Sequence, residues 1–146
     1  MKNEISVVCA GDRNFIRPIQ VMIKSIEVNT SEPVNVYILQ KGCKLLPETL
    51  EQVIYLDGDL LVEGNIRELW EIPMDGKALM AATEMFHEAY YVSSTLALRT
   101  WKKMGIPAKQ KYFNSGVLKV NLKKWRQEKI GEKIIQYLTE NKEDVL

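Results

Sequence analysis

VIYLDGD, residues 53–59, decides the fold, because four large apolar residues run directly into two carboxylates. An apolar run of this length, bounded by turn residues, predicts a strand buried on both faces of a parallel sheet. Residues i and i+2 of a strand point the same way, with Cα atoms about 6–7 Å apart. We therefore expect Asp57 and Asp59 to converge on one cation at the carboxyl edge of the sheet, where open α/β sheets bind ligands. Two hard oxygen donors favour Mg²⁺ or Mn²⁺, and such an ion in turn favours a diphosphate as the ligand. Gly58, between the two aspartates, lets a ligand approach the backbone closely.

The same stretch has a plainer interpretation. Asp-Gly is a common turn signal, and Asp often ends strands. Taken alone, VIYLDGD favours a solvated turn after a core strand. The metal site becomes the stronger hypothesis only together with the rest of the chain.

The composition is that of one ordinary globular domain. The chain has 146 residues, of which 46% are hydrophobic and 27% charged, enough for one core but not for two. Its net charge of +1 argues against a nucleic-acid partner. Basic residues gather between Lys102 and Lys129, which predicts a solvated helix face and loop or, alternatively, a positive rim that faces phosphate or an anionic surface.

Neither a membrane nor an oxidising compartment is indicated. No apolar stretch approaches the roughly 20 residues that span a bilayer, and the first residues show no signal-peptide pattern. Two cysteines, Cys9 and Cys43, do not make a disulfide framework. We therefore expect a cytoplasmic protein with no transmembrane segment.

Hydrophobic periodicity predicts alternating strands and helices. Strands are predicted at residues 5–10, 34–39, 53–56, 77–83 and 116–121. Helices are predicted at residues 15–28, 65–70 and 122–141, the last two capped by Asn65 and Asn121. The buried side of the last helix is expected to consist of Trp125, Ile130, Ile134, Ile135 and Leu138. The first 40 residues are predicted to form a right-handed β-α-β unit. For residues 86–110 a helix and a mobile loop both remain open.

The loop after the first strand, GDRN at residues 11–14, lies where a doubly wound fold places its nucleotide contacts. Ala10 and Gly11 leave room for a flat base, and Asp12 can accept a hydrogen bond from a pyrimidine N–H. The following helix N-terminus adds partial positive charge near a phosphate. A plain helix cap by Asp12 or Asn14 explains the loop equally well. There is no G-x-G-x-x-G and no Walker loop, so the dinucleotide and P-loop classes lose support.

Three further polar residues have both a functional and a plain interpretation. Asn114 offers a donor and an acceptor to a sugar hydroxyl, although Asn-Ser-Gly is usually only a turn. Glu84 follows the predicted strand 77–83 and can bind a hydroxyl or be merely solvated. His87 is the only histidine, and we expect it at the surface rather than on a metal.

Three blocks of the chain resemble glycosyltransferase family 8, the retaining GT-A enzymes that include bacterial lipooligosaccharide galactosyltransferases and glycogenin. The first is ISVVCAGDRNFIRPIQVMIKSI at residues 5–26, similar to the family's opening strand, loop and helix. The second is LPETLEQVIYLDGDLLVEGNIRELW at 46–70, which carries the D-x-D motif, and the third is YFNSGVLKVNLKKWR at 112–126. The order of the blocks and the length of the third make the resemblance specific.

The resemblance implies a fold, a reaction and a set of residue roles. The fold would be α/β of the Rossmann-like GT-A type for nucleotide-diphospho-sugar transferases, a mainly parallel sheet flanked by helices, here in one shortened domain over residues 1–146. The reaction would transfer a hexose from a UDP-sugar, with retention and with Mn²⁺ (or Mg²⁺), to a carbohydrate or lipopolysaccharide-type acceptor. The implied donor contacts are Ala10, Asp12, Asn14, Asp57 and Gly58. The implied metal ligands are Asp57 and Asp59, and the implied catalytic or sugar-binding residues are Glu84 and Asn114.

The chain also departs from the family pattern. Several dozen residues that the family places between the second strand and the Leu-Pro lead-in are missing, as are its Asp-Gln segment and its late metal-binding histidine. We therefore keep a catalytically weak or inactive UDP- and metal-binding remnant as an alternative. A haloacid dehalogenase-type phosphatase, with Asp57 as nucleophile, is a remote one, because that motif belongs on a first strand and wants Thr or Val where this chain has Leu61.

Overall fold

The structure is a computed structural model that describes residues 4–41 and 46–142. Its sheet has five strands in the order β2-β1-β3-β5-β4. The strands are β1 (Ile5–Ala10), β2 (Val34–Leu39), β3 (Gln52–Leu56), β4 (Leu79–Thr83) and β5 (Phe113–Asn121). β1 pairs in parallel with β2 and with β3, while β5 is antiparallel to β3. The predicted α/β class is confirmed.

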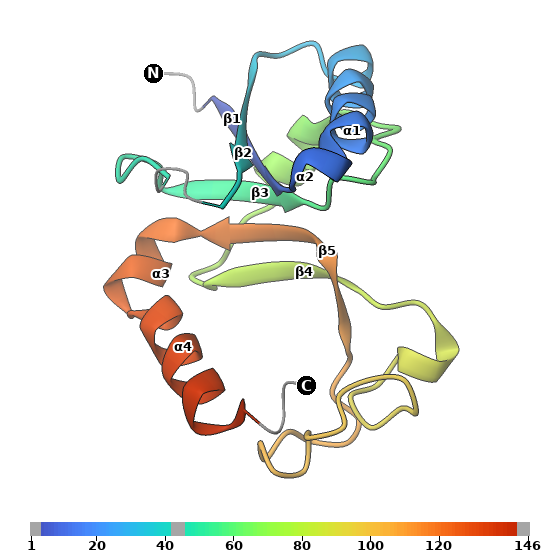
Figure 1. Cartoon of the computed structure of the whole chain (residues 1–146), viewed down its shortest axis with the longest axis vertical. Helices are drawn as coiled ribbons and strands as arrows, with labels where there is room; N and C mark the ends of the chain where they lie inside the picture. The colour runs from blue at the N-terminus through green and yellow to red at the C-terminus, as the bar shows by residue number, and fades with distance from the viewer. Residues whose placement is uncertain (1–3, 42–45, 143–146) are drawn as a thin grey trace. The chain divides into compact units, whose positions relative to one another are not determined.

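Helices connect the strands near the predicted positions (Figure 1). They are η1 (Arg13–Phe15), α1 (Ile16–Asn29), α2 (Ile66–Glu71), η2 (His87–Ala89), α3 (Leu122–Gln127) and α4 (Ile130–Glu140). Asn65 caps α2 by accepting a hydrogen bond from the Arg67 N–H, as predicted. None of the helices in the described ranges is long and apolar enough to cross a membrane.

The chain divides into two compact units. Unit 1 consists of residues Met1–Met80 and Gly116–Gln127, and unit 2 of residues Ala81–Ser115 and Glu128–Leu146. Unit 1 therefore contains β1, β2, β3, α1, α2, α3 and the paired part of β5. It is discontinuous, because residues 116–127 return to it after the chain has built most of unit 2.

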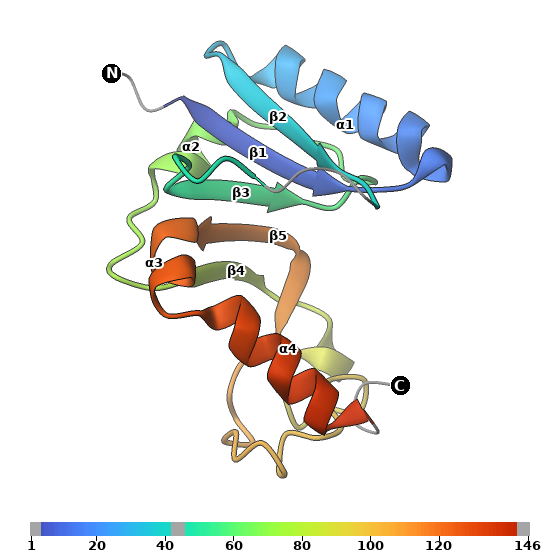
Figure 2. The ribbon, with the colours of Figure 1, turned by 60° about the vertical axis from the view of Figure 1, so that its left-hand side comes forward.

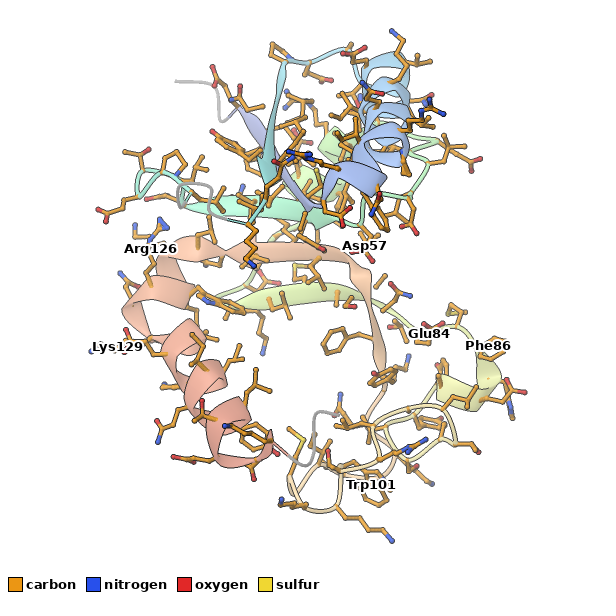
Figure 3. All side chains as sticks on the ribbon, viewed as in Figure 1. Asp57, Glu84, Phe86, Trp101, Arg126 and Lys129 are labelled. Carbon is orange, nitrogen blue, oxygen red and sulfur yellow. The ribbon has the colours of Figure 1, made fainter. Side chains whose placement is uncertain are left out.

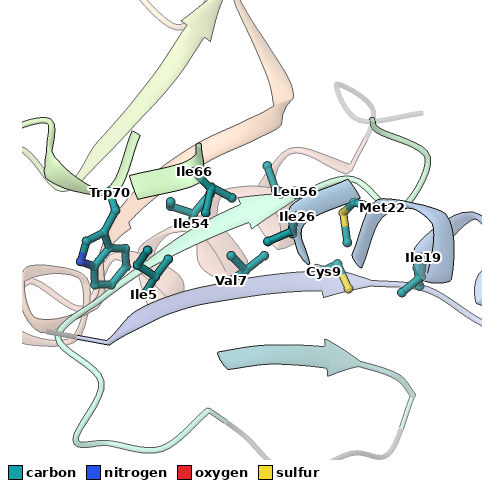
Figure 4. Packing of buried hydrophobic residues seen from close by; sticks show 10 residues of the cluster. All are labelled: Ile5, Val7, Cys9, Ile19, Met22, Ile26, Ile54, Leu56, Ile66 and Trp70. Atoms are coloured by element: carbon teal, nitrogen blue, oxygen red, sulfur yellow. The ribbon is translucent and has the colours of Figure 1, made fainter. Parts of the chain in front are cut away.

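The core of unit 1 lies between the sheet and the helices α1 and α2 (Figure 4). α1 runs along one face of β1 and β2 (Figures 1 and 2). Its apolar face places Ile19, Met22 and Ile26 against that side of the sheet, and all three side chains are buried. Ile66 and Trp70 of α2 complete the same cluster. Burying each such side chain contributes about 1.5–3 kcal/mol to the stability of the fold. This packing fixes the strands whose ends carry the candidate residues.

A buried lysine links β5 to α2. Lys119 is 3% exposed, and its ammonium group donates to the carbonyl oxygens of Trp70 and Ile72, the latter at 2.6 Å. The Nζ atom also lies 5.8 Å from the centre of the Trp70 ring. These contacts satisfy carbonyls that a helix C-terminus leaves open. Burial lowers the pKa of Lys119 from its usual value.

The cysteine in the core is a free thiol. Cys9 is buried, and burial raises the pKa of its thiol. Cys43 lies outside the described residues. The expectation that these two cysteines make no disulfide framework therefore stays a prediction.

The predicted last helix is wrong in two respects. It is interrupted at Lys129, whose φ of 53° is left-handed, a conformation that ends helices. Position 129 is a lysine and not a glycine or asparagine, the residues that usually signal this conformation. The apolar periodicity continues across Lys129, so the pattern predicted one uninterrupted helix. The predicted buried side is also wrong, because α4 contains no buried residue and Ile135 is 66% exposed.

The remaining segment, residues 86–110, is not the single helix that was one of the two predicted alternatives, and the mobility of the other alternative stays a prediction. It contains the short helix η2 followed by a series of hydrogen-bonded turns. One of these bonds joins the Val92 N–H to the Gln110 carbonyl at 2.9 Å, so the segment closes into a loop between these two residues. His87 at the start of η2 is exposed, as predicted.

Candidate functional site

The carboxylate pair leaves the centre of the sheet. Asp57 follows β3 directly (Figure 3), and its N–H donates to the Gly116 carbonyl at 2.9 Å, which extends the ladder between β3 and β5 by one step. Asp57 is half-buried and Asp59 is exposed. The first carboxylate is therefore tied to the rigid strand, and the second stands in the turn beyond it.

A tyrosine holds the first carboxylate. The Tyr55 hydroxyl donates to Oδ1 of Asp57 at 2.9 Å. Burial, the hydrogen bond to Asp57 and the negative charge of that carboxylate raise the pKa of Tyr55 to about 12. The phenol therefore keeps its proton at neutral pH and acts as a donor. Sequence analysis missed this role, although the i, i+2 spacing along a strand was a signal for it.

The opening loop forms a cap. Asp12 accepts a hydrogen bond from the Asn14 N–H at 2.8 Å through Oδ1, and its Oδ2 accepts one from the Asn14 side chain at 3.4 Å. Asp12 is thus the N-cap of η1, the plain alternative for this loop. Ala10, Asp12 and Asn14 are all exposed. Their contact with a uridine stays a prediction.

The two loops meet on the same two side chains. A Cβ added to Gly11 would lie 2.7 Å from Cδ1 of Ile19 and 2.9 Å from Cβ of Phe15. A Cβ added to Gly58 would lie 2.8 Å from Cγ1 of Ile19 and 3.5 Å from Cδ1 of Phe15. Gly58 therefore provides room for the protein's own Ile19, and this packing places the D-x-D turn beside the loop that follows β1.

Polar side chains of α1 and of its C-cap residue hold the segment after Asp59. The Ser25 hydroxyl accepts a hydrogen bond from the Val62 N–H at 2.9 Å, and the Asn29 amide donates to the Val62 carbonyl at 2.8 Å. Thr30 accepts from the Ile66 N–H at 3.2 Å. Both ends of the D-x-D turn are thus fixed, one by β3 and the other by α1. Sequence periodicity gave no sign of these contacts, because they join distant segments.

Glu84 and Asn114 form a separate pair within unit 2. The Asn114 amide donates to Oε2 of Glu84 at 3.2 Å, and the Phe86 N–H donates to Oε1 at 3.0 Å. The backbone is joined as well, since the Glu84 N–H donates to the Tyr112 carbonyl at 3.0 Å. Hydrogen bonds from the Phe86 backbone and from Asn114 lower the pKa of Glu84 below its usual value. Glu84 is therefore held as a carboxylate that accepts hydrogen bonds.

The candidate residues thus form two groups. Unit 1 holds Ala10, Asp12, Asn14, Asp57, Gly58 and Asp59, and unit 2 holds Glu84 and Asn114. Within unit 1 the opening loop and the D-x-D turn lie together. Within unit 2 the two side chains are hydrogen-bonded.

The donor set of unit 1 fits a hard divalent cation. Two carboxylates two positions apart leave a buried strand, and the Tyr55 hydroxyl occupies only one side of one oxygen, so further oxygen lone pairs are available. Among residues 4–41 and 46–142, no cluster of three or more His, Cys, Asp or Glu side chains is arranged to bind a metal ion. Binding of Mn²⁺ or Mg²⁺ by Asp57 and Asp59 therefore stays a prediction.

Known proteins share this fold. An active-site mutant of LgtC superposes with a TM-score of 0.76 over 96% of this chain and 65% of that chain, at 21% identity. The apo form of the glycosyltransferase GlyE from Streptococcus pneumoniae superposes with a TM-score of 0.69 over 94% of this chain and 39% of that chain, at 25% identity. The predicted GT-A fold is confirmed.

Sequence relatives agree with the structural ones. "Probable galacturonosyltransferase-like 4" of Arabidopsis thaliana is 31% identical over 135 residues, which are 90% of this chain and 37% of that protein. The chain spans about a third of the length of the curated relatives it matches. Residues 42–146 match the family described as "Glycosyl transferase family 8". The chain belongs to glycosyltransferase family 8.

Proposed function

We propose that this chain forms the nucleotide-sugar-binding part of a retaining hexosyltransferase that uses a UDP-sugar and Mn²⁺ or Mg²⁺. Family membership supports transfer from a sugar donor to a carbohydrate acceptor. The observation that carries the finer proposal is the position of Asp57 and Asp59. They leave the central strand β3 in a turn that packs, through Gly58, on the same Ile19 that supports the opening loop.

In this proposal the residues of unit 1 bind and orient the donor. Asp57 and Asp59 hold the cation, which would stabilise the charge on the departing UDP. The capped turn from Asp12 to Asn14 is the proposed uridine contact, and the start of the following helix adds partial positive charge. Because β1 and β3 are neighbours, both contacts come from one edge of the sheet.

Glu84 and Asn114 are the proposed sugar-binding residues. Glu84 stays ionised and so can accept hydrogen bonds from hydroxyl groups of a carbohydrate or lipopolysaccharide-type acceptor. Asn114 can donate to the donor sugar or to the acceptor.

A cytoplasmic location also stays a prediction.

Calorimetric titration of UDP in the presence of Mn²⁺ tests the donor site. We expect binding that a chelator removes and that the variant D57A/D59A lacks. The matched control is E27A/E63A, which loses the same two charges at exposed positions and should bind as the wild type does. Equal binding by wild type and D57A/D59A, or UDP binding that ignores the chelator, would refute the proposed metal site.

A second measurement separates transfer from binding alone. UDP release from several UDP-hexoses at high protein concentration would support an active transferase, and the anomeric configuration of the product, read by NMR, would test retention. Metal-dependent UDP binding without turnover would instead support the alternative of a binding remnant. The phosphatase alternative is left without support by the family assignment, and trapping a phosphoryl group on Asp57 would be needed to revive it.

A further inference from the structure

The hydrogen bond between Tyr55 and Asp57 adds a residue to the site that the D-x-D motif does not contain. Both side chains point to the same side of β3, since they are two positions apart along it. The Tyr55 hydroxyl donates to Oδ1 of Asp57 at 2.9 Å, and the Asp57 N–H donates to the Gly116 carbonyl at the same distance. Asp57 is therefore fixed both at its backbone and at its carboxylate.

The residue that provides this hydroxyl belongs to the central strand of the sheet. In the strand register, Tyr55 pairs with Val8 of β1, which is 3% exposed. Tyr55 is half-buried between its neighbours, and Cα of Val8 is also the register partner of Tyr37 on β2. The hydrogen bond from this strand residue therefore restricts the rotation of the carboxylate that it contacts.

We propose that Tyr55 is a positioning residue for the metal ligand Asp57: by holding Oδ1, it turns Oδ2 toward the cation. This inference rests on the proposed metal-binding role of Asp57 and Asp59. Without the hydroxyl, the carboxylate gains rotational freedom that binding must then remove. Partners of a metal ligand typically change the metal affinity by about 10–100-fold. Because only one hydrogen bond to the carboxylate is removed, we expect about 10-fold, the lower end of that range.

The variant Y55F tests the inference, and Y37F is its matched control. Both tyrosines pair with Val8, both are half-buried, and each substitution removes only a hydroxyl. Calorimetry with Mn²⁺ alone should give a dissociation constant about 10-fold higher for Y55F than for the wild type. Y37F should keep the wild-type value.

Measurements on the metal-free protein distinguish positioning from a general loss of structure. Three-bond NMR couplings of the Asp57 side chain should indicate one rotamer in the wild type and in Y37F, and averaging between rotamers in Y55F. The urea midpoint of Y55F should fall only by the small amount expected for one lost hydrogen bond. A much larger fall would indicate a general loss of structure and would overturn the positioning role.

The outcomes separate this inference from the proposed function. If D57A/D59A abolishes Mn²⁺ binding while Y55F binds as tightly as the wild type, the positioning role is overturned and the metal site stands. If the wild type binds no Mn²⁺, the metal site is overturned, and the positioning role with it. An unchanged Asp57 rotamer in Y55F would also contradict the inference, whatever the affinity.

Discussion

Substituting Gly58 by alanine should destabilise the protein through one defined contact. The added Cβ would lie 2.8 Å from Cγ1 and 3.4 Å from Cδ1 of Ile19. Ile19 is 3% exposed and belongs to the core, and Cγ1 lies next to its branch point rather than at a flexible end. Gly58 is not among the described glycines with positive φ, which are Gly76 and Gly105. The glycine is therefore needed for space and not for backbone conformation.

The magnitude follows from the cost of an overfilled core. Overpacking by one methyl group typically costs 1–3 kcal/mol, and a contact at 2.8 Å with a buried side chain suggests about 2 kcal/mol. With a urea m value of about 2 kcal/mol/M, the unfolding midpoint should fall by about 1 M. The control is Gly64→Ala, because a Cβ there meets nothing within 4 Å. That variant should be neutral or slightly stabilised, through a less flexible unfolded chain.

A double-mutant cycle attributes the cost to Ile19. Ile19→Ala alone should cost about 2–5 kcal/mol by leaving a cavity. In that background Gly58→Ala should cost nothing or restore some stability, because the new methyl group enters the vacated space. The expected coupling is about 2 kcal/mol, within the range for contacting residues. Strictly additive effects, or a G58A variant as stable as G64A, would refute the packing argument.

Two other predictions concern single hydrogen bonds. Asn65→Ala should lower the free energy of unfolding by about 1 kcal/mol, because the Arg67 N–H at the start of α2 loses its cap; an unchanged urea midpoint would contradict the assigned cap. NMR titration should find the pKa of Glu84 below its usual value, and Asn114→Ala should raise it only in part, since the larger contribution from the Phe86 N–H remains. A folded-state pKa below the unfolded one means that the stabilisation is present above the unfolded pKa and is lost as the pH falls through the folded pKa. A Glu84 pKa that does not respond to Asn114→Ala would contradict the pairing.

Much of the fold was predictable because local pattern and tertiary structure agree. The predicted strands 5–10 and 34–39 match β1 and β2 residue for residue, since each is a short run of β-branched residues between turn signals. The caps at Asn65 and Asn121 were also predictable from side-chain chemistry; Asn121 accepts a hydrogen bond from the Lys124 N–H at 2.9 Å. These features depend on neighbours within a few residues.

The parts that were missed depend on distant segments. The Lys119 ammonium group joins carbonyls about fifty positions earlier in the chain, and nothing in the sequence around a lysine on a strand indicates that burial. The packing of Gly58 on Ile19 of α1 also joins distant segments, while the predicted approach of a ligand to Gly58 stays a prediction. For the candidate site, residue identities could be predicted from the motif, but the supports from Tyr55 and Ser25 required the fold.

The discontinuity of unit 1 has a consequence for synthesis on the ribosome. The edge of β3 that carries Asp57 stays an open row of N–H and C=O groups until Gly116–Asn121 arrives to pair with it. Nascent chains that have emerged only as far as Met80 therefore expose an unpaired edge, the kind that invites intermolecular pairing. Completion of unit 1 must await translation of the later segment, whatever its own first eighty residues have already formed.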